Sequence, residues 1–259
     1  MRLKRRKLLK DIMIFLIPIL LCVGGYFVYD NYIKPKGIPS VNKLIKDKKN
    51  KGYSDKDQNK LNKDDYVNEL PAFREQYGNP YIMGRLQIPN LNIDTLITRA
   101  NNNEYYLNYS LTGEWDGLGV PFFDYRNVNL NEDRQINIYG HNTQKEEFYD
   151  RLPFTNLEAY MDKGIFDNYR DVYLSIDERM LEFEVVETKL ITDGNNEHMK
   201  LLFSDDMDFM QHMTKLISNP IYTTDDASFT AEDRVLVLQV CHYDPMGSYL
   251  LIICKEKKE

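Results

Sequence analysis

Cysteine is scarce in this sequence, with three residues in 259. Cys22 lies in an apolar run, so Cys241 and Cys254 are the remaining candidates for a disulfide. We expect residues 235–255 to form a hairpin in which Cys241 faces about position 251. Cys254 then lies about 10 Å further along the partner strand and points to the opposite face. The sequence therefore excludes a disulfide scaffold.

Positive charge is scarce in most of the chain. Residues 66–259 contain 17 Lys or Arg against 33 Asp or Glu. A nucleic-acid partner is excluded, because phosphate binding needs a basic face. Metal-ligand spacing is missing too, since Cys241, His242 and Cys254 match neither CxxC nor HxxxH. The sequence predicts no metal site and no cofactor.

Positive charge is instead concentrated at the N-terminus, where residues 1–10 carry six Lys or Arg and no acid. Residues 12–29 form an uncharged run of eighteen residues, about the minimum for a helix that spans a hydrocarbon core. A cleaved signal peptide is the alternative, but no small-x-small cleavage site follows. We predict a basic cytoplasmic N-terminus, a single-pass transmembrane anchor over residues 11–32 in the cell membrane, and an extracellular remainder.

Two further regions follow the predicted anchor. Residues 33–65 are rich in Lys, Asn and Asp and nearly free of large apolar residues, which predicts a tether. Residues 66–259 have a mixed composition and are long enough for one domain with its own core.

Short apolar segments separated by Asn, Gly, Pro and Asp turns predict strands in this domain. Residues 83–98 read as two strands around a Pro-Asn turn, with Leu86, Ile88, Ile93 and Ile97 as core candidates. Further strand candidates are VPFFDY, QINIYG, VYLSI, MLEFEVVETKLIT, RVLVLQV and YLLIICK. Residues 145–157 predict a short helix broken at Pro153, and residues 205–217 predict a helix with an apolar face. The fold class is mainly β with a few helices, as a barrel or sandwich.

Two chemically capable side chains sit at predicted strand ends. His141 follows the strand QINIYG, and Cys241 ends the strand that begins at residue 234. Alone, a free Cys is often buried packing and a loop His is often structural. Together they match nucleophilic catalysis, in which a thiolate attacks an acyl carbon and an imidazole transfers protons. His198 and His212 lie among acids, and we expect them to be solvated.

Over residues 79–256 the sequence resembles the sortases, and among them class B. The similar segments, in order, are GRLQIPNLNIDTLI, the stretch that ends in DYRN, NIYGHNT, the 205–217 segment with NPIY, LQVCHYD and YLLIICK. The resemblance implies an eight-stranded sortase β-barrel that follows the N-terminal transmembrane helix along the chain. It also implies a cysteine transpeptidase, with Cys241 as the nucleophile and His141 as the proton-handling residue.

The resemblance further implies the partners. Such an enzyme cleaves a C-terminal sorting signal of a protein substrate and holds the product as a thioacyl-enzyme. It then passes the acyl group to an amine of a peptidoglycan precursor or a pilin, which attaches proteins to the cell wall or builds a pilus. Asn142 and Tyr243 match neighbours of the two site residues in the family.

One departure from the family concerns its arginine. The position that should carry it is Tyr249, and no Arg follows Arg234. Tyr249 is a candidate donor to an oxyanion or to substrate, and an arginine from elsewhere, such as Arg126, is another. Two alternatives stay open: a catalytically degenerate sortase that binds a sorting signal or serves pilus assembly, and a cysteine peptidase that releases its product to water.

Overall fold

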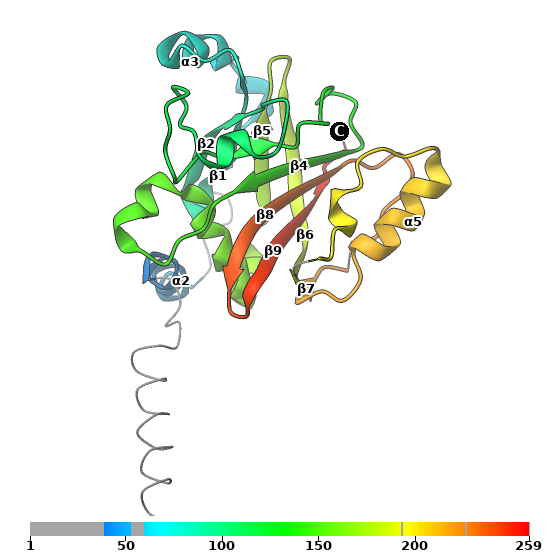
Figure 1. Ribbon diagram of the computed structural model, residues 1–259. Helices are drawn as coiled ribbons and strands as arrows, with labels where there is room; N and C mark the ends of the chain where they lie inside the picture. The colour runs from blue at the N-terminus through cyan, green and yellow to red at the C-terminus, as the bar shows by residue number, and fades with distance from the viewer. Residues whose placement is uncertain (1–38, 53–59, 193, 226, 259) are drawn as a thin grey trace, which may run out of the picture. The chain divides into compact units, whose positions relative to one another are not determined.

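The computed structural model describes residues 39–52, 60–192, 194–225 and 227–258. Eight strands of this part of the chain pair in the order β5, β1, β2, β3, β4, β8, β9, β6, and β6 pairs back with β5. The predicted mainly-β fold with an eight-stranded barrel is therefore confirmed (Figure 1). The strands are β1 (Ile82–Ile88), β2 (Ile93–Thr98), β3 (Phe122–Phe123), β4 (Gln135–Gly140), β5 (Asp171–Ser175), β6 (Met180–Thr192), β8 (Val235–Tyr243) and β9 (Met246–Glu256), with the short β7 (Tyr222–Thr223) beside β6.

Successive side chains of a strand point to opposite faces of the sheet, and β8 and β9 use both faces for packing. One set of alternate residues lies in the main core: Leu236, Leu238, Val240, Leu250, Ile252 and Cys254. The other set packs in a second cluster outside the barrel: Val235, Val237, Leu251 and Ile253. Strands buried on both faces read as continuous apolar runs, which is why these two segments are apolar throughout.

The first predicted hairpin forms as expected. β1 and β2 pair antiparallel, from Ile82 with Thr98 to Ile88 with Ile93. The four predicted core residues, Leu86, Ile88, Ile93 and Ile97, are all buried. The turn between the strands is the 3₁₀ segment η3 (Pro89–Leu91), which ends at Asn92 with a positive φ of 54°. Asn tolerates this left-handed conformation better than most residues do.

Helix α5 (Asp206–Leu216) covers the outer cluster. It begins at Asp205, whose side chain accepts a hydrogen bond from the backbone N–H of Asp208. The predicted apolar face is confirmed, because Phe209, Met213 and Leu216 are buried against the outward residues of β8 and β9. In Figure 1 this helix lies to one side of β8 and β9 and leaves their other end uncovered.

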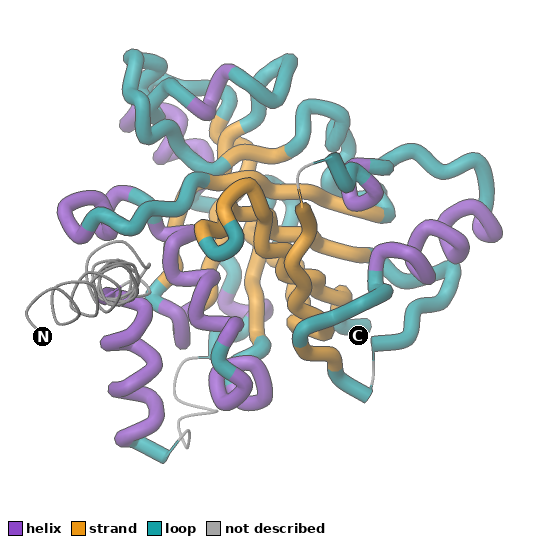
Figure 2. Tube along the Cα trace, turned by 60° about the horizontal axis from the view of Figure 1, so that its bottom comes forward, coloured by secondary structure: helices purple, strands orange, loops and turns teal. Residues whose placement is uncertain are grey.

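The remaining helical segments surround the strands, as Figure 2 shows. They are α2 (Pro39–Asn50), α3 (Leu70–Tyr77), α4 (Lys163–Asn168), and the 3₁₀ segments η2 (Lys63–Asp65), η4 (Tyr105–Leu107), η5 (Glu146–Arg151), η6 (Pro153–Met161) and η7 (Glu197–Met199). The helix predicted over residues 145–157 forms as two 3₁₀ segments, η5 and η6. The predicted break lies between them, where Pro153 is the first residue of η6.

Helix α2 lies inside the region that the sequence predicts as a tether. Its Val41 and Leu44 are buried in the main core cluster, and Ile45 packs against it. The spacing of these three residues gives one narrow apolar stripe on an otherwise charged helix. Helix α2 accordingly belongs to the same compact unit as the barrel, and the low apolar content of this region concealed the helix.

The predicted membrane anchor, residues 11–32, lies outside the described residues. Within the part of the chain that the structure describes, no helix is both long enough and apolar enough to cross a membrane.

Candidate active site

Cys241 on β8 and Tyr249 on β9 face each other, and His141 directly follows the neighbouring end of β4; these three residues form the row. β4 and β8 run parallel in register up to the pair Gly140 and Val240, so His141 follows beside Cys241. Neighbouring strands lie about 4.8 Å apart. β8 and β9 run antiparallel and place Tyr249 directly opposite Cys241. The structure therefore brings together all three residues that the sequence indicated.

The register of the hairpin differs from the expectation. The sequence predicts that Cys241 faces about position 251, whereas its partner is Tyr249. The reason is a tighter turn: β8 continues to Tyr243 and β9 starts at Met246. A shift of two residues keeps every side chain on its face, so Cys241 and Cys254 still point apart, and both are free thiols.

The side chains of Cys241 and Tyr249 point outward. Val240 and Leu250, their neighbours on β8 and β9, lie in the main core. Alternation along the two strands then directs Cys241 and Tyr249 to the outer face. Cys241 and Tyr249 thus lie on the same face of the sheet as the outer cluster that α5 covers, but closer to the hairpin that joins β8 and β9.

Gly140 explains how the polypeptide leaves β4 immediately before His141. A Cβ atom at this position would lie 2.4 Å from Cδ2 and 2.6 Å from Cγ of the buried Phe154 ring. Real Cβ atoms do not approach other atoms this closely, so glycine lets η6 pack directly on the end of β4. The close packing fixes the path of the chain into His141.

The two thiols of the domain differ in accessibility. Cys241 is partly exposed, and burial raises the pKa of its thiol. Cys254 is completely buried, and burial raises the pKa of its thiol far more. Because the thiolate is the nucleophile, Cys241 is the thiol suited to react, once a base removes its proton.

His141 is oriented by the loop that contains η4. Its Nε2 lies 2.8 Å from the carbonyl oxygen of Leu107. A carbonyl oxygen can only accept, so Nε2 carries a proton and donates it. In the neutral ring Nδ1 is then the nitrogen that is able to accept a proton. The hydrogen bond fixes both the tautomer and the orientation of the ring.

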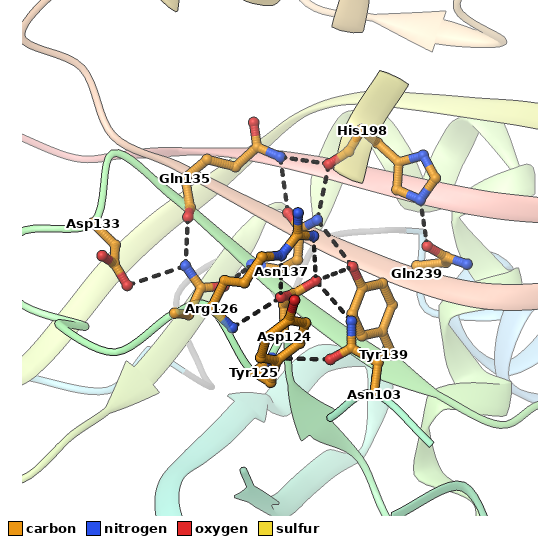
Figure 3. A network of polar contacts seen from close by, with 11 residues as sticks. Asn103, Asp124, Tyr125, Arg126, Asp133, Gln135, Asn137, Tyr139, His198 and Gln239 are labelled. Carbon is orange, nitrogen blue, oxygen red and sulfur yellow. Dashed lines mark hydrogen bonds and ion pairs between the residues drawn. The ribbon is translucent and has the colours of Figure 1, made fainter. Parts of the chain in front are cut away.

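A buried polar network, drawn in Figure 3, includes residues that precede the row on β4 and β8. Its centre is Asp124, which is completely buried. The Asp124 carboxylate accepts from Arg126 Nε at 2.8 Å, from Arg126 Nη2 at 2.7 Å, from Asn103 Nδ2 at 2.9 Å and from Tyr139 Oη at 2.8 Å. Burial opposes ionisation of Asp124, but these hydrogen bonds outweigh it and lower the pKa of the carboxyl group.

The network reaches the row through β4 and β8. Tyr139 pairs with Gln239, and these two lie two residues before His141 and Cys241. The Oε1 of Gln239 lies 2.6 Å from Nε2 of His198. The backbone carbonyl of His198 accepts in turn from Asn137 Nδ2 at 2.8 Å. Gln239 and Asn137 therefore connect η7 to strands β8 and β4 next to the row.

The expectation for His198 and His212 is wrong. Both are buried, at 3% exposure each. Nε2 of His212 lies 2.7 Å from Oε1 of Gln135, and burial lowers the pKa of both histidines. The sequence suggested solvation because acids surround them, but each ring is hydrogen-bonded to a glutamine of a barrel strand, Gln239 for His198 and Gln135 for His212. Neither ring belongs to the row.

Arg126, the other candidate donor, is paired with a buried carboxylate. Two of its guanidinium nitrogens bind the Asp124 carboxylate. Tyr249 remains the side chain directly across from Cys241. The sequence indicated this position through the family resemblance, because Tyr249 stands where the family carries its arginine.

Sequence reasoning missed one buried group close to Cys241. Glu158, from η6, accepts from the Asn142 side chain, which also donates to the Cys241 carbonyl. Glu158 also pairs with His242. Nothing in the segment FTNLEAYM distinguishes this glutamate from a surface residue, so the sequence offered no signal for it.

Comparisons with known proteins agree with this geometry, although no protein-family model matches the chain. Sortase B of Listeria monocytogenes is 27% identical over 175 residues, which cover 63% of this chain and 63% of that protein, slightly under two thirds of its length. The structure of Clostridium perfringens sortase B has a TM-score of 0.66 at 24% identity and covers 73% of this chain and 99% of its own.

A third similar protein is the Staphylococcus aureus sortase B–substrate complex. Its TM-score is 0.65 at 18% identity, and the match covers 85% of this chain and 92% of that one. These structural matches establish the fold. The predicted resemblance is confirmed: the chain is sortase B-like in sequence and in fold.

Proposed function

We propose that this chain is a membrane-anchored cysteine transpeptidase of the sortase B type. Cys241 is the nucleophile and His141 is the proton-transfer residue. The observation that carries the proposal is the parallel register of β4 and β8, which brings the residue after Gly140 beside Cys241. Cys241 is partly exposed, whereas Cys254 is buried, which supports Cys241 as the thiol that meets a substrate.

The reaction proceeds in two balanced steps. His141 takes the thiol proton as Sγ of Cys241 attacks the carbonyl carbon of the scissile amide, and the C–N bond breaks as the imidazolium returns the proton to the leaving amine. An acceptor amine then attacks the thioester carbon and loses a proton, and the C–S bond breaks to restore the thiol. The thioester keeps the acyl group activated until a positioned amine collects it.

We assign the substrate as a protein with a C-terminal sorting signal, and the acceptor as an amine of a peptidoglycan precursor or of a pilin. The Staphylococcus aureus neighbour is a sortase B–substrate complex, which supports a protein or peptide substrate. We also propose a single-pass anchor in residues 11–32, with the barrel outside the cell. Its support is the uncharged run after six cations.

A labelled sorting-signal peptide tests the proposal. The expected result is a covalent adduct on Cys241 in intact-mass spectra, lost in Cys241→Ala, and its transfer to an added amine. Equal product release with and without amine would indicate a peptidase. Absence of any adduct across several candidate peptides would favour the degenerate binding protein, the second candidate, which the tyrosine in place of arginine supports.

Tyr249→Phe is expected to slow acylation only modestly. Tyr249 lies opposite Cys241, and on this proposal its hydroxyl group donates one neutral hydrogen bond to the oxyanion that forms during acylation. Such a bond contributes about 0.5 to 1.5 kcal/mol, or about two- to twelve-fold in rate. Tyr249→Arg should preserve or raise the rate, because a charged donor stabilises an oxyanion more strongly. Single-turnover acylation of the three proteins measures this. An unchanged rate in Tyr249→Phe would show that the hydroxyl has no part in acylation.

A further inference from the structure

A buried carboxylate connects the chain on either side of the proposed active site. Glu158 is buried in η6. Its Oε1 accepts a hydrogen bond from Asn142 Nδ2 at 2.8 Å. The same Asn142 nitrogen donates to the backbone carbonyl of Cys241 at 2.8 Å. Because Asn142 directly follows His141, one amide group links the histidine segment, the cysteine strand and η6.

His242 holds the same carboxylate from the other side. Its Nδ1 lies 2.9 Å from Oε1 and 3.0 Å from Oε2 of Glu158. The hydrogen bond to Glu158 raises the pKa of His242, while partial burial opposes this. Asp244, in the hairpin turn, raises it further. The pair is therefore a charge-assisted hydrogen bond when the ring is protonated, and such bonds are shorter and stronger than neutral ones.

A second link runs parallel to the first. The hydroxyl group of Tyr243 donates to the backbone carbonyl of Asn142 at 2.8 Å. Three consecutive residues of β8, namely Cys241, His242 and Tyr243, thus contact Asn142 or Glu158. β4 itself ends at Gly140, so the strand ladder does not extend to His141, and these side-chain contacts replace it.

We propose that Glu158 is a positioning residue that sets the placement of Cys241 relative to His141, through Asn142 and His242. The inference rests on the roles assigned to Cys241 and His141 in the proposed function. Glu158 itself does not contact the thiol; it acts through the amide that binds the Cys241 carbonyl.

A double-mutant cycle on the alkylation of Cys241 tests this without a substrate. Iodoacetamide labelling is followed by intact mass in the full chain, His141→Ala, Glu158→Ala and the double variant. If His141 assists the thiol, His141→Ala slows labelling by about fivefold or more. If Glu158 sets the placement of Cys241 relative to His141, then in the Glu158→Ala background His141→Ala changes the labelling rate by less than about twofold. The reason is that the effects of coupled residues on a rate do not multiply.

Matched variants separate positioning from general stability. Glu158→Gln keeps an acceptor for Asn142 and should retain most of the coupling to His141. Glu184→Ala removes a carboxylate that pairs with Arg170 at 2.7 Å, roughly 20 Å along β6 from the residue that faces Tyr249, and should leave the coupling unchanged. If Glu158→Ala does not fold, Asn142→Ala breaks the same link and takes its place in the cycle.

Two outcomes would overturn the inference. One is an equal effect of His141→Ala with and without Glu158. The other is no effect of His141→Ala in the otherwise unchanged chain, since there would then be no placement to set. Failure of the sorting-signal peptide to form an adduct, with the coupling intact, would instead refute the transpeptidase and leave the positioning role standing.

Discussion

His141→Ala is expected to slow formation of the thioacyl-enzyme by about 10²- to 10⁴-fold, the usual contribution of a positioned general acid or base. The effect should be this large because the pKa of Cys241 is raised by burial. A thiol that is protonated at neutral pH depends on a neighbouring base for its activation. The Nε2 bond to Leu107 orients the ring that supplies this base.

The same substitution should leave the barrel folded. The His141 side chain is only partly buried, and it makes one hydrogen bond to a backbone carbonyl. Its loss costs about 0.5 to 1.5 kcal/mol. For a domain of this size that corresponds to a fall in the thermal midpoint of about 1 to 6 °C. A purely structural histidine would show the reverse pattern, with normal acylation and a large loss of stability.

Single-turnover acylation by intact mass, together with thermal unfolding, checks both parts of this prediction. Cys254→Ala is the matched control for the thiol, because Cys254 is completely buried and on the opposite face. It should form the adduct, whereas Cys241→Ala should not. An acylation rate in His141→Ala within a few-fold of the unchanged protein would refute the role of His141.

Asp124→Ala is expected to lower the free energy of unfolding by about 3 to 5 kcal/mol, the usual cost of removing one partner of a buried ion pair. The substitution leaves the Arg126 guanidinium, the Tyr139 hydroxyl and the Asn103 amide without their acceptor. At about 2 to 4 °C per kcal/mol, the thermal midpoint should fall by about 6 to 20 °C.

Asp94→Ala provides a matched control. Asp94 also receives two hydrogen bonds from one guanidinium, that of Arg85, at 2.7 Å each, but its side chain is 51% exposed. Exposed ion pairs contribute about 0 to 1 kcal/mol, so Asp94→Ala should shift the midpoint by no more than about 4 °C. Equal shifts in the two variants would show that burial of Asp124 is not what makes its network stabilising.

The effect of Asp124→Ala should depend on pH. The folded-state pKa of Asp124 is lowered below its ordinary value of 3.8. Its contribution to stability is therefore complete above about pH 4 and is lost as the pH falls through the folded-state pKa. In unfolding curves recorded between pH 7 and pH 3, the difference in the free energy of unfolding of the two proteins should be constant down to about pH 4, and it should begin to narrow as the pH falls further toward 3. A gap in stability that stayed constant down to pH 3 would contradict the ionised state assigned to Asp124.

Most barrel strands could be predicted from local sequence. β1, β2, β4, β6, β8 and β9 match apolar segments bounded by turn residues, and β6 has the predicted bounds. Helix α2 could not be predicted in this way, because its three apolar residues acquire meaning only when the barrel surface is present. Similarly, His198 and His212 looked solvated because their burial depends on η7 and α5 folding back over β4 and β8.

In the candidate site, too, the identity of the residues could be predicted from the sequence but their arrangement could not. His141 and Cys241 could be identified because each stands at the end of an apolar segment, and Tyr249 because the family resemblance places an arginine there. Their common row could not, since it depends on a parallel pairing between segments about 100 residues apart. Pairing of distant segments is decided by packing of the whole sheet rather than by local preference.

By itself the sequence determined which segments form most of the strands, the two candidate catalytic side chains and the acidic character of the domain, because these follow from residue type and short-range spacing. Only the tertiary structure decided which side chains became neighbours. It placed His141 beside Cys241, Tyr249 across from it, and Glu158 behind both through Asn142. The physical reason is that hydrogen bonding and burial act between elements brought together by barrel closure, at separations along the chain that no local pattern records.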